Sequence, residues 1–202
     1  MHKIILAALM TAAIPAVANA EASHPRSLLA MSPTEFAQAT TLHDDRLESH
    51  ATLSTEKAHR EGWKLLKPYG HDNHLRAIVD KQTGATTYEV RQSLRYWGLQ
   101  RDYTDAHYVG PKGLQKVALS EARHGADVCP TTENNLECPL SKTMAFQVDE
   151  ATMRQIAASG GNSWDFKLKD QTGHDIRTGI VPAEAAGLLQ AVDSYRARIT
   201  AS

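Results

Sequence analysis

The chain has 202 residues, with 22 Lys and Arg against 23 Asp and Glu, a formal net charge of −1 and 42% hydrophobic residues. This near-balance of charge does not favour nucleic acid or an anionic membrane surface as a partner. Beyond the N-terminus no apolar run is long enough to cross a bilayer, so we expect no transmembrane segment there.

The first twenty residues have the three parts of a secretory signal peptide. Lys3 supplies a positive charge, residues 4–17 are uncharged and mostly apolar, and Ala18-Asn19-Ala20 fits the small-x-small cleavage pattern. A buried N-terminal helix or a membrane anchor is the alternative interpretation. We expect a cleaved signal peptide over residues 1–20 and a mature protein from Glu21, in the periplasm or secreted.

Cleavage leaves 182 residues, enough for one domain with a sizeable core. We expect an N-terminal lead-in over residues 21–38 and a single domain over residues 39–202. Within the lead-in, Ser32-Pro33-Thr34-Glu35 has the form of a capping box with proline at the first helical position. It predicts a short helix through Ala39, and a strand that begins at Ala39 is the competing interpretation.

A long β-hairpin is the clearest element of the sequence. Residues 75–80 are apolar and β-prone, and residues 81–84 form a turn that ends in glycine. Residues 87–97 then alternate strictly between two faces, which is typical of a strand. A second Gln-Thr-Gly, at residues 171–173, predicts another hairpin turn of the same kind.

Shorter strands are expected at residues 51–54, 103–109 and 115–119, around Met144 to Val148, and before the second turn. Two helices are expected, one over residues 150–159 capped by Asp149 and one from Pro182 to the C-terminus. This order predicts an α+β fold. Its antiparallel sheet has several short strands and one long hairpin, and the C-terminal helix packs on the sheet.

The two cysteines are Cys129 and Cys138. In an exported protein, an even pair predicts a disulfide bond. A redox-active pair usually has the tighter Cys-x-x-Cys spacing, which is missing here. Two free thiols are the remaining alternative.

Histidines offer the one candidate metal site. His71 and His74 have a His-x-x-His spacing that can bind Zn²⁺ or Cu²⁺ if the backbone turns and a third ligand, such as His50 or His59, joins them. The Asp and Asn between the two histidines are equally typical of an ordinary solvated turn, which we favour. No other cofactor is predicted.

The polar face of the long strand is the candidate ligand site. Arg91, Arg95 and Trp97 share that face, and Arg101 lies just beyond it. Arginine beside an aromatic ring can hold a carboxylate or sugar-like ligand by paired hydrogen bonds and stacking. The alternative is a solvated sheet face on which Glu89 is a cross-strand charge partner.

The sequence has neither the Gly-x-Ser-x-Gly pattern of a nucleophile elbow nor the Gly-Lys-Ser/Thr ending of a phosphate loop. The sequence therefore favours an exported binding or accessory module over an enzyme. We expect its partner to be an envelope protein, a glycan or a peptide. The alternative is a small metal-dependent or hydrolytic periplasmic enzyme that uses the histidines.

Overall fold

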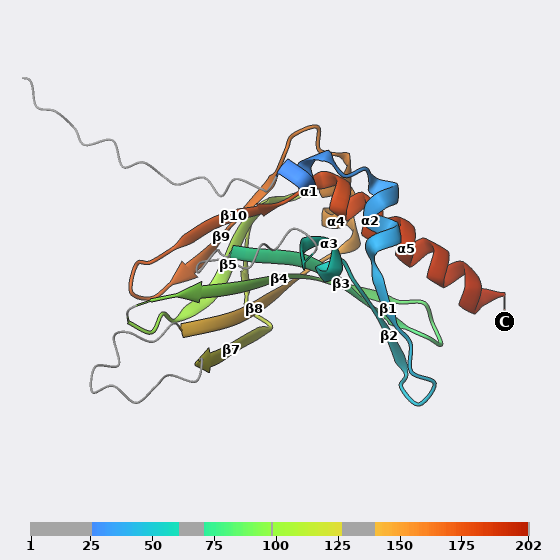
Figure 1. Cartoon of the computed structure of the whole chain (residues 1–202), viewed down its shortest axis with the longest axis horizontal. Helices are drawn as coiled ribbons and strands as arrows, with labels where there is room; N and C mark the ends of the chain where they lie inside the picture. The colour runs from blue at the N-terminus through green and yellow to red at the C-terminus, as the bar shows by residue number, and fades with distance from the viewer. Residues whose placement is uncertain (1–25, 61–70, 98, 127–139, 202) are drawn as a thin grey trace, which may run out of the picture.

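The computed structural model describes residues 26–60, 71–97, 99–126 and 140–201 (Figure 1). The expected signal peptide over residues 1–20 and the expected Cys129–Cys138 disulfide lie outside the described residues. Both stay predictions.

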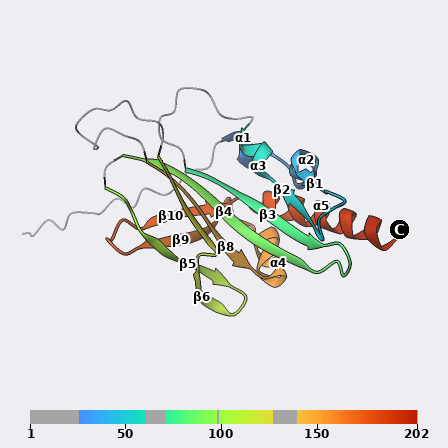
Figure 2. The same cartoon turned by 90° about the horizontal axis from the view of Figure 1, so that it is seen from below.

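Two antiparallel sheets and a long C-terminal helix form the framework, so the predicted α+β class is confirmed (Figures 1 and 2). The larger sheet has the order β1-β2-β3-β4-β8-β7. Its strands are β1 (Thr41–His43), β2 (His50–Ser54), β3 (His71–Asp80), β4 (Thr86–Tyr96), β8 (Leu140–Val148) and β7 (Glu121–Ala126). The smaller sheet has the order β10-β9-β5-β6, with β10 (Ile176–Ile180), β9 (Trp164–Asp170), β5 (Tyr103–Gly110) and β6 (Gly113–Ala118). The sequence pointed to a single sheet, and the structure divides these strands between two.

The predicted long hairpin is formed by β3 and β4, which pair from His71↔Leu94 to Val79↔Thr86. Strand β3 begins earlier than expected, because the polar residues 71–74 are part of the strand. Gly84 closes the turn with φ +72°, a backbone conformation that favours glycine. The second predicted turn joins β9 to β10, and there Gly173 has φ +88°.

Five helices lie in the described part of the chain: α1 (Arg26–Ala30), α2 (Pro33–Ala39), α3 (Glu56–Arg60), α4 (Glu150–Ala158) and α5 (Pro182–Thr200). The capping box of Ser32 and Glu35 is present at the start of α2, and Asp149 caps α4. Helices α4 and α5 match the two expected helices, α2 settles the choice left open between a helix and a strand, and α1 and α3 are additional. None of the described helices combines the length and apolar character that a bilayer crossing requires.

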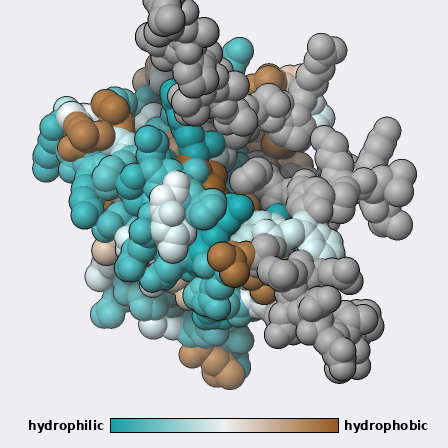
Figure 3. Space-filling view, turned by 90° about the vertical axis from the view of Figure 1, so that its left-hand side faces the viewer, coloured by the Kyte–Doolittle hydropathy of each residue, from teal (hydrophilic) through white to brown (hydrophobic). Residues whose placement is uncertain are grey.

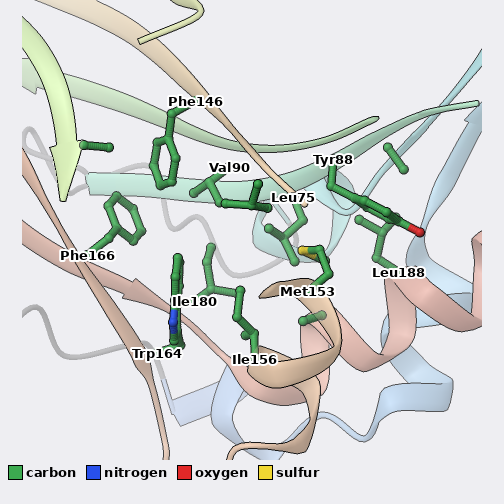
Figure 4. Packing of buried hydrophobic residues seen from close by; sticks show 14 of the residues in the cluster. Leu75, Tyr88, Val90, Phe146, Met153, Ile156, Trp164, Phe166, Ile180 and Leu188 are labelled. Carbon is green, nitrogen blue, oxygen red and sulfur yellow. The ribbon is translucent and has the colours of Figure 1, made fainter. Parts of the chain in front are cut away.

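The core lies between the two sheets and is closed at one end by α4 and α5 (Figure 4). Phe146 on β8 contacts Phe166 on β9 edge to face, with ring centroids 5.1 Å apart. Met153 on α4 and Leu188 on α5 point into the same core from the helical side (Figure 4). The expectation that the C-terminal helix packs on the sheet is confirmed.

Helix α2 lies against α5 at Gly187. A Cβ atom at position 187 would come within 2.5 Å of the Phe36 Cβ and within 2.6 Å of the Pro33 carbonyl oxygen. Phe36 is fully buried in a second, smaller cluster with Leu28, Ala58 and Val181. Part of the expected N-terminal lead-in therefore packs on the last helix through a contact that has no room for a side chain.

Candidate functional site

The outer face of β4 carries the candidate ligand residues. Glu89 lies opposite Arg76 of β3, whose Nη2 and Nε atoms donate hydrogen bonds of 2.6 and 2.9 Å to Glu89 Oε2. Glu89 is only 6% exposed. The alternative interpretation of Glu89 as a cross-strand charge partner is thus confirmed, but its carboxylate is buried, so the sheet face is not solvated at this position.

Arg91 extends the same ionic contacts across two strands. Its Nη1 atom donates a 2.8 Å hydrogen bond to Glu121 of β7 and lies 3.5 Å from Glu89 Oε2. Strand β8 lies between β4 and β7, and the position between Arg91 and Glu121 is Ala145. An alanine there leaves room for the guanidinium to reach over β8.

Glu121 in turn lies 3.0 Å from Arg123 Nε, so five alternating charges form what we call the arginine–glutamate row. The row consists of Arg76, Glu89, Arg91, Glu121 and Arg123. The hydrogen bond from Arg91 lowers the pKa of Glu121 against the opposing effect of burial. The carboxylates of Glu89 and Glu121 therefore already bind Arg91. These contacts hold the strands together.

Arg95 and Trp97 lie further along β4, beyond the arginine–glutamate row. Arg95 is exposed, and Trp97, one residue after the strand ends, is 39% exposed. Position 95 has the parity of the outer face of β4, whereas Trp97 lies beyond the end of the strand, so the predicted shared face of the two residues stays a prediction. They are the members of the predicted set that are most open to a ligand.

Arg101 lies apart from these two residues. Its guanidinium stacks over the ring of Tyr96, with the Cζ atom 4.6 Å from the ring centroid, and Tyr96 is a buried residue of the inner face. Arg101 Nη1 also donates a 3.4 Å hydrogen bond to the Tyr103 hydroxyl. Arg91 and Arg101 are thus less exposed members of the predicted set with contacts to Glu121 and Tyr96, whereas Arg95 and Trp97 are its more exposed members.

A buried lysine near the same end of β4 was not anticipated. The Lys142 side chain has no exposed surface, and its Nζ atom donates a 2.9 Å hydrogen bond to the Arg101 carbonyl oxygen and lies 3.9 Å from Asp102 Oδ1. Burial lowers the pKa of Lys142, although Asp102 and Asp170 oppose the change. Its inward orientation could have been inferred from its position in the strand, because Lys142 continues the inward-facing series of Met144, Phe146 and Val148.

Two buried amides lie on the inner face beside this lysine. Asn73 Nδ2 donates a 3.0 Å hydrogen bond to Thr178 Oγ1 and a second to the Gly179 carbonyl, which links β3 to β10. Gln92 is 1% exposed and donates to the Ser93 carbonyl at 2.7 Å, while its Oε1 atom has no hydrogen-bond partner among the described residues. These amides make this end of the core polar, in contrast to the apolar end beneath α4 and α5.

The prediction of a solvated turn between His71 and His74 is wrong, because both residues belong to strand β3. Successive positions of a strand alternate between faces, so positions three apart do not share one. His74 is buried, and the His71 side chain lies outside the described residues. Within the described ranges no group of three or more His, Cys, Asp or Glu residues is arranged to hold a metal.

The possible third ligands do not strengthen this pair. His50 lies opposite Asp80 at the far end of β3 from His71, with Nε2 3.6 Å from Asp80 Oδ2. His59 is in α3, and its side chain lies outside the described residues. Zinc or copper binding at His71 and His74 stays an untested prediction that the strand geometry does not favour.

The chain was compared with protein-family models, with curated proteins and with solved structures, and none of them matched.

Proposed function

We propose that the protein is an exported, non-enzymatic binding or accessory module of the bacterial envelope. Its contact site comprises Arg95 and Trp97, and its ligand is an anionic glycan or peptide of the envelope. The observation that carries this proposal is the exposure of Arg95 on the outer face of β4 and of Trp97 directly after the strand ends. The proposed export rests on the signal-peptide pattern of residues 1–20.

The chemistry of the pair suits such a ligand. A guanidinium donates two parallel hydrogen bonds to a carboxylate or phosphate, and an indole ring stacks against a sugar ring or a peptide plane. The arginine–glutamate row lies next to the pair and holds β4 in register with β3 and β7. A contact site on a strand fixed in this way loses little conformational freedom when it binds.

The test uses the mature chain from Glu21 with its cysteines oxidised, sedimented with purified peptidoglycan sacculi, which contain both glycan and acidic peptide. We expect the wild type to sediment with the sacculi and the double variant Arg95→Ala/Trp97→Ala to bind about tenfold more weakly or worse, a loss of about 1.4 kcal/mol or more. Its melting temperature should fall only slightly, because Arg95 is exposed and Trp97 is partly exposed.

A matched control changes two exposed residues of β6, Leu114→Ala with Lys116→Ala, and should bind like the wild type. Full binding by the Arg95/Trp97 variant, or no binding by the wild type, would overturn the proposal. Arg91→Ala is unsuitable as a binding test, because it removes a partner of two carboxylates and alters stability instead.

A further inference from the structure

Strand β6 is an edge of the smaller sheet, with β5 on one side and no described strand on the other. In Figure 2 it lies at the lower edge of the molecule. The Leu119 N–H donates a 3.0 Å hydrogen bond to the Thr104 carbonyl at the end of the β5–β6 ladder. Because hydrogen-bonded and non-hydrogen-bonded pairs alternate along an antiparallel ladder, the backbone groups of Leu114, Lys116 and Ala118 point away from β5. The edge of β6 therefore presents backbone donors and acceptors at every second residue.

Two large apolar side chains lie on the outer face beside this edge. Val109 of β5 and Leu114 of β6 are directly opposite each other in the ladder, and they are 58% and 76% exposed. The face of the molecule in Figure 3 is mainly hydrophilic with separate apolar patches, so apolar groups in solvent are local features of this protein. A sheet edge that combines outward backbone groups with exposed apolar side chains is a ready template for another strand.

We infer that β6 binds an extended segment of another protein as an additional antiparallel strand. This goes beyond the proposed function and uses none of its residues. Leu114, Lys116 and Ala118 would each exchange a pair of backbone hydrogen bonds with the added strand, which supplies affinity without regard to sequence. Alternate side chains of the added strand would lie on the outer face, where an apolar residue opposite Leu114 would cover exposed apolar surface.

Lys116 indicates the second feature of the partner. Its side chain is 65% exposed, and its Nζ atom lies 3.4 Å from Asp105 Oδ2 of β5. An ammonium group has three donors, so Asp105 occupies only part of the hydrogen-bonding capacity of Lys116. Opposite charges that face each other across two strands stabilise the pairing, and like charges destabilise it. The segment that fits β6 therefore carries a carboxylate opposite Lys116 and an apolar residue opposite Leu114.

A second copy of the chain fits this edge less well. Antiparallel pairing of β6 with itself about Lys116 sets two lysines directly opposite each other. Pairing about Leu114 brings the leucines together but sets Lys116 opposite Lys112 of the copy. Registers about Gln115 or Val117 leave Leu114 opposite a lysine or a serine. A different protein with an acidic and apolar segment is the better partner.

The test uses the mature, isotope-labelled protein and the capped peptide Thr-Val-Thr-Glu-Thr-Val-Thr, whose Val and Glu side chains would share one face. We expect the peptide to shift the nuclear magnetic resonance signals of the Leu114, Lys116 and Ala118 amides. N-methylation of the Val and Glu residues removes the donors that face β6, and it should weaken binding at least tenfold. N-methylation of the Thr residues, whose N–H groups face away, should have little effect. Lysine in place of the peptide's Glu should also weaken binding.

Lys116→Pro tests the same contact from the protein side. Proline removes an N–H group that takes no part in the ladder with β5, so the protein should stay folded while peptide binding falls about tenfold. Lys116→Ala is the matched control, which keeps the N–H group and should lose only the preference for Glu over Lys in the peptide. Sacculus binding should be the same in both variants, so this inference and the proposed function can fail separately.

Three outcomes would contradict strand addition at β6. These are the absence of binding by the unmodified peptide, equal binding by its two N-methylated forms, and signal shifts confined to other strands. Dimerisation of the free protein that Lys116→Pro abolishes would show instead that a second copy occupies the edge.

Discussion

The two Gln-Thr-Gly turns are both closed by an aspartate carboxylate, but they have different roles in the fold. In the β3–β4 turn, Asp80 Oδ1 accepts hydrogen bonds from the Thr83 N–H at 2.7 Å and the Thr83 hydroxyl at 2.8 Å. In the β9–β10 turn, Asp170 Oδ2 accepts from the N–H and the hydroxyl of Thr172. The aspartate is one residue closer to the threonine in the second turn, yet each carboxylate holds its turn closed.

The surroundings separate the two aspartates. The Asp80 side chain is 30% exposed, whereas the Asp170 side chain has no exposed surface. Asp170 also accepts hydrogen bonds from the backbone N–H groups of Asp102, at 2.5 Å, and His174, at 3.2 Å. It thereby fixes the connection that crosses from the larger sheet to the smaller one. The same short sequence can thus be a surface turn in one place and a junction between sheets in another.

Removal of each carboxylate is the strongest test of this difference. We expect Asp170→Ala to lower the free energy of unfolding by about 3 kcal/mol, because several donors lose their acceptor in a buried place. Asp80→Ala should cost clearly less, since water can replace its acceptor. Urea unfolding with an unchanged m-value would measure both. Equal losses in the two variants would show that the surroundings of Asp170 add nothing.

The pH dependence sharpens the comparison. Burial alone would raise the pKa of Asp170, but hydrogen bonds from Thr172, His174 and Asp102 outweigh it and lower the pKa. The stabilisation by the carboxylate is therefore complete above the ordinary Asp pKa of about 3.9 and is lost as the pH falls through the lower folded-state value.

Asp170→Asn keeps one acceptor and should cost about 1.5 kcal/mol at neutral pH. The difference in unfolding free energy between the wild type and this variant should then shrink below about pH 4. A difference that stayed constant down to pH 2 would mean that the charge of Asp170 does not contribute.

Substitution of the turn glycines should lower the free energy of unfolding least, and by nearly the same amount in the two turns. Gly84→Ala and Gly173→Ala each place a Cβ atom in the left-handed backbone region, which should cost about 1 kcal/mol. Within the described ranges neither variant creates a clash, because no atom lies within 4 Å of the added atom at Gly173 and only Arg196 Cγ lies at 4.0 Å at Gly84. Thermal unfolding of both variants would reveal the costs, and a clearly unequal pair would point to tertiary contacts at one turn.

Much of the fold could be predicted because its signals are local. The alternation of β4, the capping box of Ser32 and the start of α5 at Pro182 each follow from a few neighbouring residues. Strand β7 has no such signal, since Glu121–Ala126 contains no apolar alternation and is held in place by pairing with β8. The division into two sheets likewise depends on pairings between distant segments, which composition and periodicity do not encode.

In the candidate site too, local patterns could be predicted from the sequence and contacts between distant segments could not. The outward position of Arg95 could be predicted from parity along one strand. The engagement of Arg91 by Glu121 could not, because it requires β8 to lie between β4 and β7 with Ala145 at the crossing point. Lys142 was missed because a lysine in an alternating strand is ordinarily assigned to the solvent side, whereas here its ammonium group binds a carbonyl inside the molecule.

The close contact of Gly187 with α2 has a consequence for the order of folding. Phe36 and Gly187 are separated by most of the described chain, and the site that receives Phe36 is built from the backbone of the last helix. As the polypeptide is synthesised, α2 emerges early, whereas α5, the helix on which it packs most extensively, follows at the end of the sequence. We therefore expect closure of the N-terminal cluster to be a late step in folding, and we expect a chain truncated before α5 to leave Phe36 more exposed to chaperones and proteases.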